Sequence, residues 1–553
     1  MEGLSMCLNK NKYFEPLATF FLLLMIFYSL SFAQIEKLKI ILYLGDTHSK
    51  TAIEAIKTIE REYPEIKEKV SFYVHTSQSL KGRQTDHLKD ITSSKTIFIL
   101  LIMDRQAVES ARSYIEAVVK NGGKVYAVGG IYGKEHKEMG LIDDEIVKKY
   151  YSEGSLENIK NMILFVMKRD FGFNVSYKEP IPIPDFGIYL KKENKIVENF
   201  DDFLKHYPID GNRPWIGITF YKSTVVSGNT AHLDFLIDSL EKEGFNVLPV
   251  YGYPSEMAVE RFFFDKNGRS RVAVVVGMSL KVGLNPQIAI PVLSKLNVPV
   301  INAITLYRHS REEWEKSPVG LDIFERSWQV ALPEMGGIIQ PTVIASKEKV
   351  IDKETGIEYI EERPIPERVN RLVARIKAWI NLQNKPNGEK RVAIIYYNYP
   401  PGKQNIGAAY LNVLPESLWE ILNRLKNEGY NVGEKEITKE RLFHDIQNFA
   451  RNIGNWAKGE IDKLVKTGKP ILIPVETYRK WFEELPEGLK RAVIKDWGPP
   501  EENKIMSWTD ATGAKYIVIP GVRYGNILFT PQPSRGWEQD VKKLYHDVTL
   551  APH

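Results

Sequence analysis

The C-terminal part of the chain gathers side chains that could hold a planar or anionic ligand. Aromatic rings and guanidinium groups stack on flat molecules, and glycines let a backbone approach a ligand closely. Their irregular spacing over residues 521–536 fits neither a helix nor a strand, so it predicts a loop that forms a site or an interface. The candidate ligand-binding residues of this run are Arg523, Tyr524, Asn526, Gln532 and Arg535.

Two histidines near the C-terminus are candidate metal ligands. His546 lies between Tyr545 and Asp547, and His553 follows Pro552. Imidazole and carboxylate groups bind borderline cations, but one His-Asp pair without further spaced ligands is a weak metal signal. The alternative for this pair is a solvated helix end.

His232 is a candidate catalytic residue because it follows a glycine loop at the start of a predicted helix. Asn229 or Thr230 is the expected N-cap, and the free amides of a helix N-terminus attract anions. His232 could therefore act as a ligand or a base beside a bound carboxylate. The alternative is a histidine that packs against its own strand loop.

Glu334 is the second candidate catalytic residue. It lies in the apolar Leu332-Pro333-Glu334 turn and could be a general base or a metal ligand. The alternative is a carboxylate that accepts hydrogen bonds from the backbone amides of Gly336 and Gly337.

Four separate stretches of the sequence carry a family resemblance: residues 211–214 with 227–232, 330–334 with 340–341, 398–401 with 407–411, and 521–553. Together they resemble the large subunit of cobaltochelatase (the CobN type) and the H subunit of magnesium chelatase. This resemblance implies insertion of cobalt or magnesium into a tetrapyrrole, with ATP used through separate AAA-type ATPase subunits. It adds Asn229 and Tyr410 to the candidate ligand-binding residues.

The same resemblance implies that this chain is an amino-terminal half, since proteins of that family continue far beyond the matched part. Catalysis would then need a chain that carries the C-terminal half. Gly336, Gln340 and Asn412 replace acidic residues of the relatives, which weakens attraction for a divalent ion. An exported, non-catalytic protein that binds a corrinoid, a porphyrin or a metal is therefore the alternative function, and a decayed fragment is a third.

Short apolar runs alternate with amphipathic stretches from Lys39 onward, and residues 215–220 and 246–250 are two of the runs predicted as strands. This alternation predicts an α/β fold, with several doubly wound parallel-sheet (Rossmann-like) domains in tandem. The predicted parts are residues 1–33 as a signal peptide or membrane anchor, 34–185 and 186–345 as α/β domains, 346–390 as a charged connection and helix, and 391–553 as a further α/β domain.

The first 33 residues resemble an export signal. Lys10 and Lys12 precede an apolar run from Leu17 to Leu30, and Ser31-Phe32-Ala33 supplies small residues for cleavage. We therefore expect a periplasmic or cell-envelope location, with an uncleaved anchor or a buried core helix as alternatives and the cytoplasm if the signal is not used.

Charge and motif content exclude two classes of function. The formal charge of +5 is spread over 75 basic and 70 acidic residues, which does not form a nucleic-acid footprint. No Gly-x-x-x-x-Gly-Lys-Ser/Thr run occurs, so ATP hydrolysis by this chain is not expected.

Overall fold

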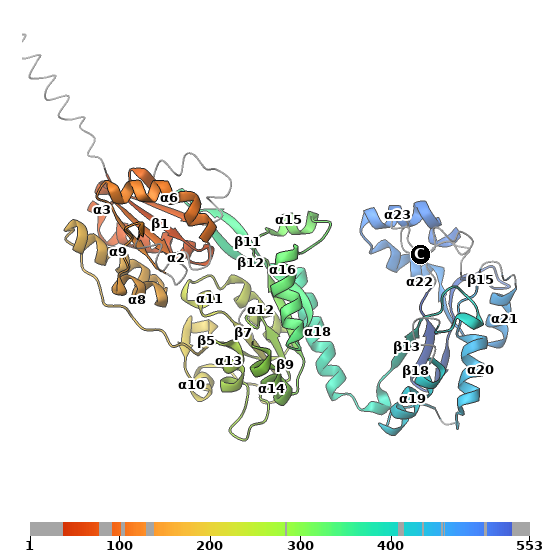
Figure 1. The fold of residues 1–553 in the computed structure, drawn as a ribbon. Helices are drawn as coiled ribbons and strands as arrows, with labels where there is room; N and C mark the ends of the chain where they lie inside the picture. The colour runs from red at the N-terminus through yellow and green to blue at the C-terminus, as the bar shows by residue number, and fades with distance from the viewer. Residues whose placement is uncertain are drawn as a thin grey trace, which may run out of the picture. The chain divides into compact units, whose positions relative to one another are not determined.

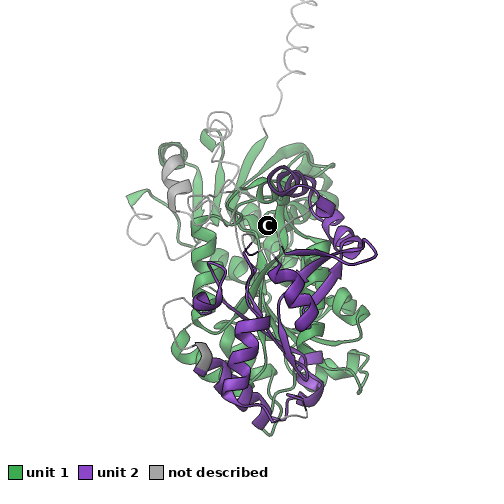
Figure 2. Cartoon of the chain, turned by 90° about the vertical axis from the view of Figure 1, so that its right-hand side faces the viewer, with its two compact units in different colours: residues 1–380 green, residues 381–553 purple. Residues whose placement is uncertain are grey.

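The computed structural model divides the chain into two compact units, residues 1–380 and 381–553 (Figure 2). Candidate residues Tyr410, Arg535, His546 and His553 lie outside the described residues. The finer domain boundaries stay predictions. The structure describes residues 37–76, 91–100, 105–128, 138–281, 285–407, 414–433, 436–454, 457, 459–502 and 506–533.

Unit 1 begins with a four-stranded parallel sheet in the order β2-β1-β3-β4. Its strands are nearly continuous apolar runs because helices cover both faces. Helices α2 and α9 share one core with the sheet, and α6 packs in the core on its other face. The elements are β1 (Leu38–Leu44), α2 (Asp46–Glu62), α3 (Pro64–Lys69), β2 (Val70–Thr76), β3 (Thr96–Leu100), α6 (Arg105–Lys120), β4 (Lys124–Ala127), α8 (Glu145–Glu153) and α9 (Leu156–Phe171).

The second sheet of unit 1 has eight strands in the order β12-β11-β10-β9-β7-β8-β5-β6. Its five central strands, from β11 to β8, run parallel. The strands are β5 (Gly187–Leu190), β6 (Lys195–Val197), β7 (Trp215–Phe220), β8 (Asn246–Tyr251), β9 (Val274–Gly277), β10 (Val300–Thr305), β11 (Ile339–Ile351) and β12 (Glu358–Pro364).

Helices cover both faces of this sheet (Figure 1). One core joins it to α12 and α18, and the other joins it to α10, α13 and α14. The helices are α10 (Phe200–His206), α11 (Lys222–Val226), α12 (Ala231–Lys242), α13 (Ser255–Phe262), α14 (Pro286–Leu296), α15 (Arg311–Lys316), α16 (Ile323–Arg326), α17 (Leu332–Met335) and α18 (Pro366–Asn384), with a π-helical turn at Ser327–Ala331 between α16 and α17.

A β-hairpin connects the two sheets of unit 1. The first part of β11 pairs with β10, and its second part continues beyond that pairing and pairs with β12. This extension contacts α2, where the backbone amide of Ile360 donates to Ser49 Oγ at 3.0 Å and Lys57 pairs with Asp352 at 3.2 Å. Figure 1 shows the hairpin reaching toward the first sheet.

Unit 2 contains two three-stranded sheets, ordered β13-β18-β17 and β14-β16-β15. Strands β13 and β18 are parallel, and the other pairs are antiparallel. The elements are β13 (Val392–Tyr396), α19 (Leu414–Asn427), α20 (Lys439–Phe449), α21 (Glu460–Thr467), β14 (Ile471–Pro474), α22 (Val475–Glu483), α23 (Glu487–Trp497), β15 (Ser507–Thr509), β16 (Lys515–Ile519), β17 (Val522–Tyr524) and β18 (Ile527–Pro531). Short 3₁₀ turns occupy Lys191–Glu193, Asn387–Glu389, Lys403–Asn405 and Pro500–Glu502.

The predicted α/β class with mainly parallel sheets is confirmed, and the predicted strand Trp215–Phe220 coincides with β7. The prediction of one irregular loop over residues 521–536 is wrong for its described part, because β17 and β18 form an antiparallel pair there. Within the described ranges, no helix is long and apolar enough to span a membrane.

Candidate functional site

The carboxyl ends of β7, β8, β9 and β10 lie at one edge of the eight-stranded sheet. The chain leaves β7 toward β8 on one side and reaches β9 on the other, so the strand order reverses between β7 and β9. Ligands of open α/β sheets bind outside the carboxyl ends, at such a reversal. Here Met278 and Ser279, directly after β9, contact the end of β7, because their amides both donate to the Thr219 carbonyl, at 2.9 and 3.2 Å.

Exposed aromatic and aliphatic side chains mark the surface at this edge. Tyr221 follows β7, Tyr253 follows β8 and Tyr307 follows β10, and their exposed fractions are 41%, 70% and 41%. Scattered exposed apolar residues need no explanation, but several at one edge of a ligand-binding fold do. We call the exposed set of Tyr221, Tyr253, Tyr307, Arg308, Ile323 and Phe324 the edge surface.

The part of the edge surface around Trp328 is a connected aromatic cluster. The Trp328 ring contacts Tyr307 edge-on at 5.8 Å and Phe324 at 6.3 Å between centroids. The Arg308 guanidinium lies 4.2 Å from the Phe324 ring centroid. Rings and a stacked cation side by side suit a flat ligand that carries carboxylates.

A buried polar network lies at the same sheet edge. Lys281 is 2% exposed, and its Nζ donates to the Ala303 carbonyl at 2.6 Å and to Gln329 Oε1 at 3.3 Å. Asn302 donates to the Gln329 carbonyl at 2.7 Å. Burial lowers the pKa of Lys281 to about 7, although the Glu325 carboxylate opposes this shift. The enclosed amine fixes the π-helical turn.

The structure brings the predicted residues His232 and Asn229 together under β12. His232 is 1% exposed, and its Nε2 lies 3.3 Å from Glu362 Oε2. The Glu362 amide donates to Asn229 Oδ1 at 2.9 Å. Burial lowers the pKa of His232, while Glu362 and Asp234 oppose the shift. A neutral imidazole that donates to Glu362 fits this geometry, and within the described structure Nδ1 of His232 and Nδ2 of Asn229 have no hydrogen-bond partner.

We expect His232→Ala to lower the free energy of unfolding by about 2 kcal/mol, because Glu362 loses a buried donor. The measurement is urea unfolding followed by circular dichroism. His206→Ala is the control, since its ring is 37% exposed and its ion pair with Glu193 contributes less than about 1 kcal/mol. Equal losses in the two variants would contradict a stabilising role for the His232–Glu362 contact.

Glu334 lies on the surface in α17. The amides of Gly336 and Gly337 donate to the backbone carbonyls of Pro333 and Glu334, at 2.9 and 3.0 Å. The alternative in which the Glu334 carboxylate binds these amides is therefore wrong. A role as base or ligand stays a prediction.

The described candidates of unit 2 lie at both ends of β18. Tyr524 donates to Asp445 at 2.8 Å, and burial together with this carboxylate raises the pKa of its hydroxyl group. Asn526 donates to the Gly388 carbonyl at 3.1 Å, and Arg523 is exposed. Gln532 lies at the opposite end of the strand, where its backbone amide donates to the Tyr396 carbonyl. The structure therefore does not bring these four residues into one cluster.

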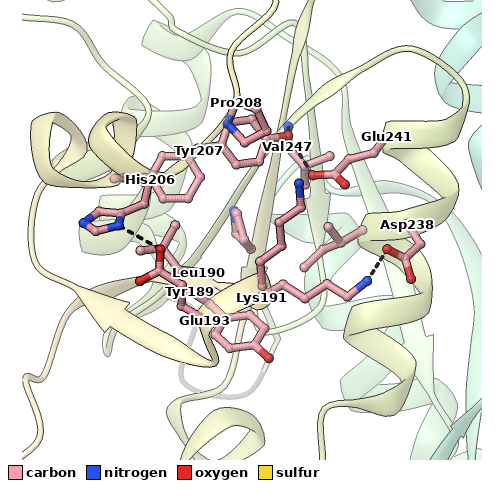
Figure 3. A pocket seen from close by; sticks show the side chains of 14 residues that line it. Tyr189, Leu190, Lys191, Glu193, His206, Tyr207, Pro208, Asp238, Glu241 and Val247 are labelled. Carbon is pink, nitrogen blue, oxygen red and sulfur yellow. Dashed lines mark hydrogen bonds and ion pairs between the residues drawn. The ribbon is translucent and has the colours of Figure 1, made fainter.

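A cavity lies at the amino end of β8, between the β5 region, α10 and α12 (Figure 3). Three pairs of its lining residues contact one another: His206 with Glu193 at 2.7 Å, Lys191 with Asp238, and Tyr207 with Glu241 at 2.9 Å. These contacts occupy groups that a ligand would otherwise bind.

Lys281, Glu325, Gln329 and Glu362 were not predicted from the sequence. They come from three separate segments, since only Glu325 and Gln329 lie in one helical stretch, so no local motif joins the set. In the aromatic run at residues 262–264, Phe262 and Phe263 are buried in the core. The Phe263 ring fills the space where a Cβ on Gly217 would lie, 2.6 Å away.

The fold is that of an α/β protein with mainly parallel sheets. The family model described as CobN/Magnesium Chelatase matches residues 148–553 of the chain, and the chain belongs to this family. An uncharacterized protein of Methanocaldococcus jannaschii is 32% identical, over 74% of this chain and 34% of that protein. The chloroplastic magnesium-chelatase subunit ChlH of Oryza sativa is 29% identical, over 73% of this chain and 29% of its own length.

Two cobaltochelatase proteins match over a larger share of the chain. The aerobic cobaltochelatase subunit CobN of Pseudomonas aeruginosa is 24% identical, over 93% of this chain and 40% of that protein. The solved catalytic subunit of cobaltochelatase from Mycobacterium tuberculosis shares the fold, with a TM-score of 0.59 at 22% identity, over 93% of this chain and 40% of that one. The chain thus spans about a third of the length of the curated relatives it matches.

Proposed function

We propose that this chain is a chelatase large-subunit homologue that binds a tetrapyrrole for insertion of cobalt or magnesium. The observation that supports this most is the edge surface, where exposed rings and Arg308 lie at the carboxyl edge of a parallel sheet. Family membership adds support, because relatives are named as cobaltochelatase and magnesium-chelatase subunits.

In this proposal the edge surface holds one face of the ring. Tyr307 and Phe324 pack against the apolar macrocycle, and Arg308 pairs with a propionate or acetate group. The enclosed Lys281 and Gln329 support the turn that carries Phe324 and Trp328. ATP is used through separate AAA-type subunits, and a chain with the C-terminal part of the family completes the enzyme.

A second candidate is an exported protein that captures a corrinoid, a porphyrin or a metal without turnover. The signal-like residues 1–33 and the uncharged Gly336 and Gln340 favour it. In the structure, Gln340 Oε1 accepts a hydrogen bond from the Trp379 indole at 3.1 Å, so this position holds α18 rather than a cation. Both candidates use the same ring-binding surface.

The test is a titration of the chain with a porphyrin and with a cobalt-free corrinoid precursor, followed by absorbance and tryptophan fluorescence. We expect saturable binding of one ring per chain. Adding cobalt or magnesium, ATPase subunits and the C-terminal part of a relative then separates the two candidates, since insertion shifts the absorbance of the ring. A folded chain that binds neither ring would overturn tetrapyrrole binding in both candidates and leave only capture of a metal from the second.

A further inference from the structure

Three side chains of types that can bind metal ions lie close together between the end of β10 and α16. One ligand atom each from His309, Asp322 and Glu325 lies within 4.8 Å of the other two. Nδ1 of His309 is 3.6 Å from Oε2 of Glu325, which is too long for a hydrogen bond. None of these three residues was predicted from the sequence, because thirteen to sixteen positions separate the histidine from the two acids.

Glu325 is the strongest sign that a cation belongs here. It is fully buried, and its Oε1 accepts from the backbone amides of Tyr307 and of Arg308, the latter at 3.3 Å. Its Oε2 is buried and has no hydrogen-bond partner in the described structure. A buried carboxylate oxygen without a donor costs free energy, so a group that compensates its charge is expected.

Within the described residues, no lysine or arginine forms an ion pair with Glu325, and the His309 imidazole is 3.6 Å from Oε2. Lys281 directs its Nζ to the Ala303 carbonyl and to Gln329 Oε1, and within the described residues it makes no ion pair with Glu325. Gln329 donates to the other oxygen, Oε1, at 3.5 Å. Arg308 stacks on Phe324. The oxygen that faces His309 is left for an added cation.

Of the remaining two ligands, Asp322 is held in place and His309 is reachable from solvent. Asp322 is the N-cap of α16, and its Oδ1 accepts from the Glu325 amide at 2.8 Å, which fixes the carboxylate beside the cluster. The His309 side chain is 34% exposed. An ion can therefore enter from solvent past the imidazole.

We propose that His309, Asp322 and Glu325 form a binding site for a divalent transition-metal ion. One imidazole and two carboxylates suit zinc, cobalt or manganese better than magnesium, which prefers an all-oxygen octahedral shell. Three protein ligands leave at least one position for water or for an exchanging ligand. Binding needs the cation alone and does not depend on the proposed tetrapyrrole function.

The test is calorimetric titration of the full chain with zinc, together with cobalt titration followed by visible absorption. We expect one ion per chain at this site, with the d–d bands of bound cobalt. Glu325→Gln and His309→Ala should each weaken binding by at least about tenfold, the smallest loss seen when even a supporting residue of a metal site is removed.

Glu313→Gln is the matched control, because Glu313 caps the neighbouring helix through Ser310 and lies outside the cluster. It should bind zinc as the unchanged chain does. His309→Ala keeps the proposal testable if Glu325→Gln fails to fold, since His309 is partly exposed. Absence of binding by the folded chain, or equal binding by His309→Ala, would overturn the proposal.

Discussion

Lys281→Met should remove a rise in stability of about 3 kcal/mol that the unchanged chain shows between pH 7 and pH 10. Burial lowers the pKa of Lys281 to about 7 in the folded chain, whereas the unfolded amine has a pKa of about 10.4. Between these values the unfolded chain binds the extra proton. The free energy of unfolding therefore rises with pH in that window and is flat, for this group, below it.

The measurement is urea unfolding at pH 7, 8, 9 and 10 for both chains. Methionine is the variant because it fills a similar volume without a charge. Lys281→Met leaves the Ala303 carbonyl and Gln329 without their donor, so the free energy of unfolding can be lower at every pH. The slope of that free energy against pH is the quantity that reports titration of the amine. Gln329→Leu is the control, since it keeps the buried amine and should keep the slope. Parallel curves for the unchanged chain and Lys281→Met would show that the amine is solvated.

Tyr307→Ala combined with Phe324→Ala should weaken porphyrin binding by about 30- to 150-fold, which corresponds to about 2 to 3 kcal/mol. Both rings contact Trp328, so removing them takes away one continuous face of the edge surface. Both side chains are more than 40% exposed, so folding should change little. Titration by tryptophan quenching gives the dissociation constants.

Trp481→Ala is the matched control for this prediction. The Trp481 side chain is 52% exposed and belongs to α22 of unit 2, far in sequence from the residues of the edge surface. It should bind porphyrin as the unchanged chain does, after correction for its own fluorescence. An effect of Trp481→Ala as large as that of the double variant would indicate nonspecific binding of the porphyrin to exposed aromatic side chains.

The sequence predicted the central strands well because they are apolar runs between glycine and proline signals. Trp215–Phe220 and Asn246–Val250 are examples, and the structure extends the second by only one residue. It did not predict the β11–β12 hairpin. Lys347, Glu348 and Glu361 give that segment the composition of a charged connection, and its strand state depends on pairing with β10 and contact with α2.

The site was harder to predict than the fold, because burial of a charge has no local signal. In the sequence, Lys281 and Glu325 do not differ from exposed polar residues. Only the folded topology shows that they are buried at one edge of the sheet. His232 and Asn229 were found because a helix start after a glycine loop is a local pattern. The short strands β17 and β18 were not predicted, because glycines and polar residues interrupt their apolar pattern. Their pairing with each other supplies their stability.

The most direct test of the account is hydrogen–deuterium exchange of the full chain with and without saturating porphyrin. The account predicts slower exchange at residues 219–226, 251–259 and 305–335, which carry the edge surface, and little change in α20 to α23 of unit 2. Protection confined to unit 2, or no protection of residues 305–335 at saturation, would contradict a tetrapyrrole site at the carboxyl edge of the eight-stranded sheet.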